Sequence, residues 1–217
     1  MTDNRKAGIA LIAGSLGGIL TMAIHPTGGG QLAPEQVAHL AVVSAVAHSI
    51  ALVSVVVLFL GACGLARSIA TADRISFAAI VTFGFACVAI FIAAAVSGFI
   101  IPGIMKLMAR DTSTGPHAWQ IVITGIFQIN QAMSRIYSVA ASLAIILWSI
   151  SVLRNSDLSR PIAVYGCLMS VLIIAAIGSG YLRLNIHGMA AVWLAQAVWF
   201  VLIGSQLYSH PTRRASA

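Results

Sequence analysis

Long apolar stretches, separated by short clusters of polar or charged residues, dominate the pattern along this chain. A helix needs about 20 mostly apolar residues to cross the hydrocarbon core of a membrane, and six stretches reach that length. We therefore predict an all-α, polytopic membrane helix bundle with one domain over 1–209 and a short basic tail over 210–217. The six predicted transmembrane spans are 7–25, 39–64, 75–101, 127–153, 161–182 and 188–208.

The composition favours a membrane protein over a soluble one. Hydrophobic residues make up 59% of the 217 residues and charged residues only 8%, whereas a soluble domain carries roughly 25% charged residues. Apolar side chains can instead face the lipid of a bilayer, which is the partner that this composition predicts. The net charge of +7 does not indicate a nucleic-acid partner, because Lys and Arg occur in ones and twos between apolar runs.

Basic residues in the loops predict the orientation. The cytoplasmic loops of membrane proteins carry an excess of Lys and Arg. Three of these residues fall on one predicted side: Lys106, Arg110 and Arg183. Eight fall on the other, which we expect to be cytoplasmic together with both termini: Arg5, Lys6, Arg67, Arg74, Arg154, Arg160, Arg213 and Arg214.

The first span could be a signal peptide or a retained helix. The first begins like a secretory signal peptide, but no A-x-A site closes it, so we expect a retained helix. Its Gly14 and Gly18 have the four-residue spacing that permits close helix packing.

The helical pattern over 117–153 would extend roughly 50 Å, beyond a core of about 30 Å. We therefore expect 116–127 to form an interfacial helix on the outer face, with a bend at Gly125.

Histidines gather on the predicted outer half of the bundle: His25, His39, His48, His117 and His187. His48 lies inside an apolar span, where an imidazole needs a partner or a water-filled cavity. One interhelical hydrogen bond would satisfy it, and contact with a ligand, a haem or a metal is the alternative. We include His48 and His187 among the candidate ligand-binding residues.

Arg135 interrupts an otherwise charge-free run. Its guanidinium stays charged, so it must be paired, reach water by snorkelling, or contact a bound anion. Polar residues recur around it at helical spacing, a stripe that favours a cavity in the bundle interior. The sixth span adds Gln196, which we expect at the depth of His48. The stripe comprises Gln128, Gln131, Arg135, Ser138 and Ser142.

The histidines also permit a metal or haem site. A bis-His haem needs two imidazoles on facing helices at matching depth, which His25 or His39 could form with His187. The same three residues are the candidates for a zinc or copper ion, but no HxxxH or HExxH spacing supports one. We therefore predict no cofactor and no metal, with haem or a transition metal as the less favoured alternative.

Short segments resemble a bacterial multi-pass membrane family of unknown function. They are the N-terminal Arg5-Lys6-Ala7-Gly8, the loop 154–160, His187-Gly188-Met189, and the run from Ala195 to Phe200. The resemblance implies a multi-pass protein of the prokaryotic inner membrane. It implies no established activity and carries over no catalytic residues.

Three hypotheses for function follow, and none invokes a catalytic signature, so we favour a role that is not enzymatic. The first is an outward-facing pocket of His, Arg and Gln side chains that binds or transports a small polar or anionic ligand. The second is a structural or accessory subunit that packs, through small-residue helix faces, with a membrane partner or as a homo-oligomer. The third is a membrane redox protein that binds haem or a metal.

Overall fold

The computed structural model describes residues 3–26, 34–69, 74–111, 116–155 and 158–209, so the predicted tail lies outside the described residues. All regular structure in these ranges is helical. Six helices are long and apolar enough to cross a membrane, which confirms the predicted fold class. In chain order the elements are α1 (Asp3–Ile24), α2 (Pro34–Ile69), α3 (Arg74–Ala95), the π-helix η1 (Val96–Ile100), α4 (Ile101–Met108), α5 (Pro116–Asn155), α6 (Arg160–Gly178) and α7 (Ile186–Ser209).

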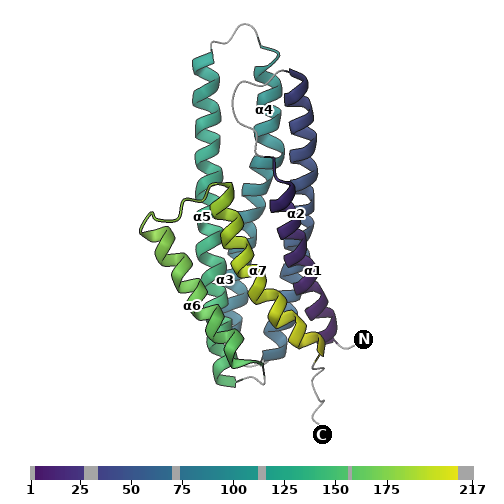
Figure 1. Ribbon diagram of the computed structural model, residues 1–217, viewed down its shortest axis with the longest axis vertical. Helices are drawn as coiled ribbons and strands as arrows, with labels where there is room; N and C mark the ends of the chain where they lie inside the picture. Colours follow the sequence, from purple (N-terminus) through teal and green to yellow (C-terminus); the bar gives the residue numbers. More distant parts are fainter. Residues whose placement is uncertain (1–2, 27–33, 70–73, 112–115, 156–157, 210–217) are drawn as a thin grey trace.

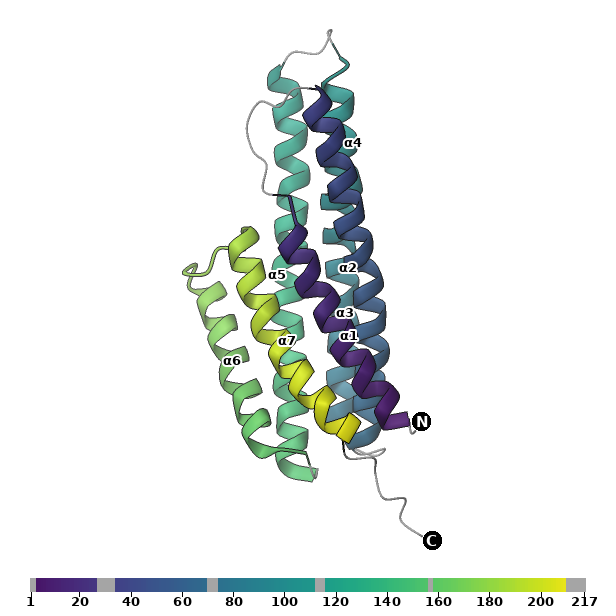
Figure 2. The ribbon, with the colours of Figure 1, turned by 45° about the vertical axis from the view of Figure 1, so that its right-hand side comes forward.

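The bundle combines three long spans with three short ones. α2 has 36 residues, the continuous α3–η1–α4 span has 35, and α5 has 40. At ~1.5 Å per residue these spans measure roughly 50–60 Å, longer than the whole bilayer of about 40–45 Å. α1, α6 and α7 have only 19 to 24 residues. One end of α2, α4 and α5 therefore extends beyond the short helices (Figures 1 and 2).

The expected interfacial helix over 116–127 was wrong. α5 runs without interruption from Pro116 to Asn155, and Gly125 lies inside it. A glycine within a helix costs only about 1 kcal/mol relative to alanine, which is too little to end a helix of this length. The surplus length therefore forms part of the extension instead of lying on the membrane surface.

Small residues bring α1 close to its neighbours. A Cβ atom built on Gly14 would lie 2.6 Å from the backbone nitrogen of Leu58 on α2, so no larger residue fits there without a shift. A Cβ on Gly18 would overlap the indole of Trp193 on α7. The close packing predicted from the glycine spacing is therefore confirmed at both positions. α1 packs against α2 and α7 as an integral part of the bundle.

Aromatic side chains fill the core toward the end of the bundle where α1 begins and α7 ends. Trp148 stacks on Trp199, and Phe83 and Phe200 pack against them. All four are almost completely buried. Many large apolar side chains, such as Phe85 at 68% exposure, lie on the outer surface. Apolar side chains therefore cover the surface as well as filling the core, which contact with lipid permits.

Both ends of the bundle domain lie on one side, as an even number of spans requires (Figure 1). Nε of Arg5 on α1 donates a hydrogen bond of 3.3 Å to the carbonyl of Tyr208 on α7. The same guanidinium lies 5.2 Å from the centre of the Tyr208 ring, within the range of a cation–π contact. The start of α1 and the end of α7 are thus fastened together.

Candidate functional site

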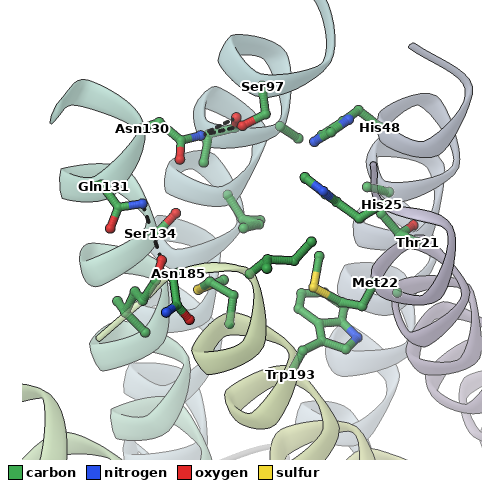
Figure 3. A pocket seen from close by; sticks show the side chains of 18 of the residues that line it. Thr21, Met22, His25, His48, Ser97, Asn130, Gln131, Ser134, Asn185 and Trp193 are labelled. Carbon is green, nitrogen blue, oxygen red and sulfur yellow. Dashed lines mark hydrogen bonds between the residues drawn. The ribbon is translucent and has the colours of Figure 1, made fainter. Parts of the chain in front are cut away.

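A cavity of about 250 Å³ opens among the helical elements α1, α2, α3, η1, α5 and α7, in the half of the bundle away from the start of α1 and the end of α7. Figure 3 shows amide side chains of α5 on one side and two imidazoles, from α1 and α2, on the other. Its lining is mostly apolar with a few polar groups, which is typical of small-molecule sites. The polar and aromatic lining residues are Thr21, His25, His48, Ser97, Phe127, Asn130, Gln131, Ser134, Asn185 and Trp193.

The π-helix η1 forms one edge of this cavity. Nδ2 of Asn130 on α5 donates to the carbonyl of Ala93 and to Oγ of Ser97, both at 2.8 Å. A carbonyl oxygen can only accept, so the Ala93 contact fixes which end of the amide is nitrogen. Both amide hydrogens are then used, and Oδ1 remains as the acceptor. Single π-helical turns occur frequently at functional sites, and this one carries Ser97 to the cavity.

The two imidazoles form the opposite wall. Nδ1 of His48 lies 2.7 Å from the carbonyl of Ser44, and Nδ1 of His25 lies 3.0 Å from the carbonyl of Pro26. Each Nδ1 must carry the hydrogen, because a carbonyl only accepts. Nε2 of each neutral ring is therefore left with a lone pair. The ring centres are 5.0 Å apart and the planes meet at 71°.

Local sequence explains how both imidazoles reach this wall. Pro26 disfavours helical backbone at the preceding residue, so α1 ends at Ile24 and His25 lies just beyond it. His48 occupies space that only a glycine provides: a Cβ on Gly98 would lie 2.8 Å from Cγ of the imidazole. Oγ of Ser44 also donates to the carbonyl of Ser97 at 3.0 Å, which ties α2 to η1 beside the ring.

Hydrogen-bond acceptors predominate among the oriented polar groups of the cavity. Nε2 of Gln131 donates to the carbonyl of Leu184 at 3.2 Å, so its Oε1 remains an acceptor. With Oδ1 of Asn130 and the two imidazole nitrogens, the lining holds four neutral acceptors, although Figure 3 shows Oε1 of Gln131 on the side of its amide away from the imidazoles. Asn185 adds one oriented donor, because its Oδ1 accepts from the backbone N–H of Gly188 at 2.9 Å and its Nδ2 is left over. Across the described part of the chain, no Asp, Glu, Lys or Arg lines the cavity. The cavity therefore suits hydrogen-bond donors or a cation better than an anion.

Trp193 and the two methionines Met22 and Met189 provide an apolar side to the cavity. The indole of Trp193 stacks on Tyr137, with ring centres 5.4 Å apart. Gln196, one helical turn further along α7, does not line the cavity. Its Nε2 donates to Oγ of Ser142 at 3.1 Å, within a buried seam between α5 and α7.

The structure brings only part of the predicted site together. His48 and Gln131 line the cavity. Gln128, Arg135 and His187 are exposed and lie outside its lining. Along the predicted stripe, Ser138 and Ser142 are completely buried while Arg135 points out of the bundle. Sequence reasoning missed Asn130, because its position on the buried face depends on how α3 and η1 pack against α5.

The predicted metal candidates are not brought together either. His39 and His187 are exposed, while His25 pairs with His48. Within the described ranges no group of three His, Cys, Asp or Glu side chains could hold a metal ion. Two axial imidazoles on opposite sides of a haem iron would have ring centres about 6 Å apart, with the porphyrin between them. The ring centres of His25 and His48 are 5.0 Å apart, closer than in that arrangement.

No protein-family model matches the sequence, no curated protein is detectably similar to it, and no solved structure matches its fold. The resemblance to a bacterial membrane family therefore stays a prediction. The class of protein follows from the fold itself: an integral membrane protein of six apolar helices. Within that class, the cavity with neutral acceptors is the distinguishing feature.

Proposed function

We propose that this protein is a receptor or transporter of the bacterial plasma membrane that binds a small, hydrogen-bond-donating molecule in the cavity. The observation that carries the proposal is the chemistry of the lining. Lone pairs of Asn130, His25 and His48 are available, and no charged side chain of the described residues accompanies them. An unpaired acceptor in an apolar surrounding gains most from a ligand that supplies the missing donor.

The apolar side of the cavity narrows the class of ligand. Trp193, Phe127 and Met22 offer aromatic and thioether surface opposite the polar groups. A molecule with an apolar body and a hydroxyl or amine group matches both surfaces, as alcohols, phenols and amines do. A carboxylate or phosphate would place its own lone pairs against those of Asn130, His25 and His48, with Nδ2 of Asn185 as the one oriented amide donor of the described lining. The proposal therefore retains the predicted polar ligand but not the predicted anionic one.

Two observations support an outward-facing cavity. The described ends of α1 and α7 lie together on the side opposite the cavity, joined by Arg5 and Tyr208. Outside Arg135, the described residues include nine basic side chains, and six of them lie at that same end of the bundle, which is the pattern of a cytoplasmic face. The cavity would then receive its ligand from outside the cell.

Matched ligand pairs test the proposal. The full chain in lipid nanodiscs is titrated with small phenols, their O-methyl ethers and the corresponding benzoates, with chelator present throughout. We expect binding of at least one phenol, with a loss of about 10-fold or more in affinity for its ether, which lacks the donor. Equal or tighter binding of the ether or the benzoate would contradict the proposal.

A variant locates the binding site. Ala51→Phe fills the cavity from α2, whereas Val53→Phe adds the same side chain at a position that is 65% exposed. Loss of binding is expected in the first variant only. Binding that persists in Ala51→Phe would place the ligand elsewhere.

A further inference from the structure

The imidazole wall has a feature that the proposed organic ligand does not require. His25 and His48 come from different helices, yet both donate through Nδ1 to a backbone carbonyl. Proteins orient metal-binding imidazoles in this way, because the anchored Nδ1–H fixes the tautomer and directs the Nε2 lone pair at the ion. Figure 3 shows the two rings reaching toward the same corner of the cavity.

The spacing of the rings fits a shared ion. Two imidazoles that bind one ion at ~2.0–2.1 Å with a trigonal or tetrahedral angle have ring centres about 5 Å apart. The observed separation is 5.0 Å. A linear arrangement would need about 6 Å, so the pair leaves one or two coordination positions open toward the cavity.

We propose that His25 and His48 hold one cuprous ion through their Nε2 atoms. The surroundings select this ion over a divalent one. Neither a carboxylate nor a thiolate lines the cavity among the described residues, so a second positive charge would be uncompensated in an apolar environment. Cuprous copper carries a single charge and accepts neutral imidazole and thioether ligands.

The lining of the cavity also includes a thioether. Met22 lines the cavity three residues before His25, near the end of α1. Soft sulfur ligands favour cuprous copper over zinc or nickel, which adds a reason for the choice of ion. The flexible methionine side chain can adjust to complete a trigonal site.

This inference shares the imidazoles of His25 and His48 with the proposed organic ligand, but it needs no contact with the amide of Asn130 on α5. The phenol titration is performed with chelator, and the copper titration without organic ligand. Failure of either one therefore leaves the other result intact.

The test is a cuprous titration of the full chain in nanodiscs, under reducing conditions and in competition with a colorimetric cuprous chelator. We expect one ion per chain in the wild type. His25→Gln and His48→Gln should each weaken binding by more than ~100-fold, beyond the 10–100-fold typical of losing an outer-shell partner. His39→Gln and His187→Gln, which change exposed histidines outside the lining, should retain wild-type affinity.

A second measurement keeps the proposal testable if a variant fails to fold. X-ray absorption of the copper-loaded wild type should show two imidazole ligands in a three- or four-coordinate site. Four results would each overturn the proposal. They are no stoichiometric copper, equal loss of affinity in the exposed-histidine controls, tighter binding of Zn²⁺ than of cuprous ion, and an absorption spectrum without imidazole scattering.

Discussion

Asn130 and Ser97 are joined by a hydrogen bond of 2.8 Å, from the amide nitrogen on α5 to the hydroxyl in the π-helix η1. The same nitrogen donates to the carbonyl of Ala93 at 2.8 Å. One amide therefore fastens α5 to the last turn of α3 and directs an acceptor at the cavity. It links the stability of the bundle to the chemistry of the proposed site.

Asn130→Leu should affect both the stability of the bundle and the binding of the ligand. The variant removes the Oδ1 acceptor and leaves the buried Ala93 carbonyl without its partner. We expect the free energy of unfolding to fall by about 1–3 kcal/mol and affinity for the phenol to fall roughly 3- to 10-fold. Gln128→Leu, an exposed amide two residues earlier, is the control and should change neither. Equal effects of the two variants in melting and titration experiments would contradict this assignment.

Arg135→Gln should leave ligand binding unchanged. The guanidinium is exposed and lies outside the cavity lining, although its neighbour Ser134 is buried and lines it. We expect a change in the free energy of unfolding within about 0.5 kcal/mol, as for other surface substitutions. Phenol affinity of the reconstituted variant should equal that of the wild type. A loss of affinity greater than about 5-fold would show that Arg135 contributes to the binding site.

The exposed position of Arg135 shows what helical periodicity leaves open. Spacing groups residues on one face but does not say where that face points. Successive residues are turned by about 100° around a helix, so a small error in the centre of the buried face moves a side chain from cavity to surface. Here α7 covers Ser138 and Ser142, and α3 with η1 covers Asn130. Arg135 is left on the uncovered side.

Gln196→Leu should be nearly neutral. Nε2 of Gln196 is hydrogen-bonded to Ser142, but its buried Oε1 has no partner among the described residues. Nε2 also donates to the carbonyl of Ser138, at 3.4 Å. Replacing this half-satisfied buried amide with an apolar group of similar size exchanges two long hydrogen bonds for relief of an unpaired acceptor. We expect the free energy of unfolding to change by less than about 1 kcal/mol. Phenol and copper affinities should be unaffected, and a large loss of either would show that Gln196 reaches the cavity.

The sequence was sufficient for the bundle but not for the site. Six apolar runs, each long enough to cross a membrane, specify the helices, because the requirement for internally satisfied backbone groups leaves few alternatives. The pairing of His25 with His48 depends on where α1 ends against α2, and the exposure of Oδ1 of Asn130 depends on a π-helical turn. Neither depends on spacing along one segment, so neither could be predicted from it.

Two glycine substitutions should have opposite effects on stability. Gly14→Ala would place a Cβ 2.6 Å from backbone atoms of Leu58, which cannot rotate away. We expect a loss of about 1–3 kcal/mol from overpacking. The Cβ that Gly125→Ala adds to α5 would have no atom within 4 Å. The higher helix propensity of alanine should therefore raise the free energy of unfolding by up to about 1 kcal/mol. Thermal melting of both variants in the same detergent compares them, and destabilisation by Gly125→Ala would contradict the open surface there.

The orientation of the chain can be tested by cysteine labelling. With Cys63, Cys87 and Cys167 replaced by alanine, single cysteines are introduced as Tyr181→Cys and Arg154→Cys. Tyr181 is 92% exposed in the connection between α6 and α7, on the cavity side, and Arg154 is exposed near the opposite end of α5. If the cavity faces outward, a membrane-impermeant maleimide should label the first variant in intact cells. It should label the second only after the cells are permeabilised. The reverse result would place the cavity on the cytoplasmic side and make an intracellular molecule its ligand.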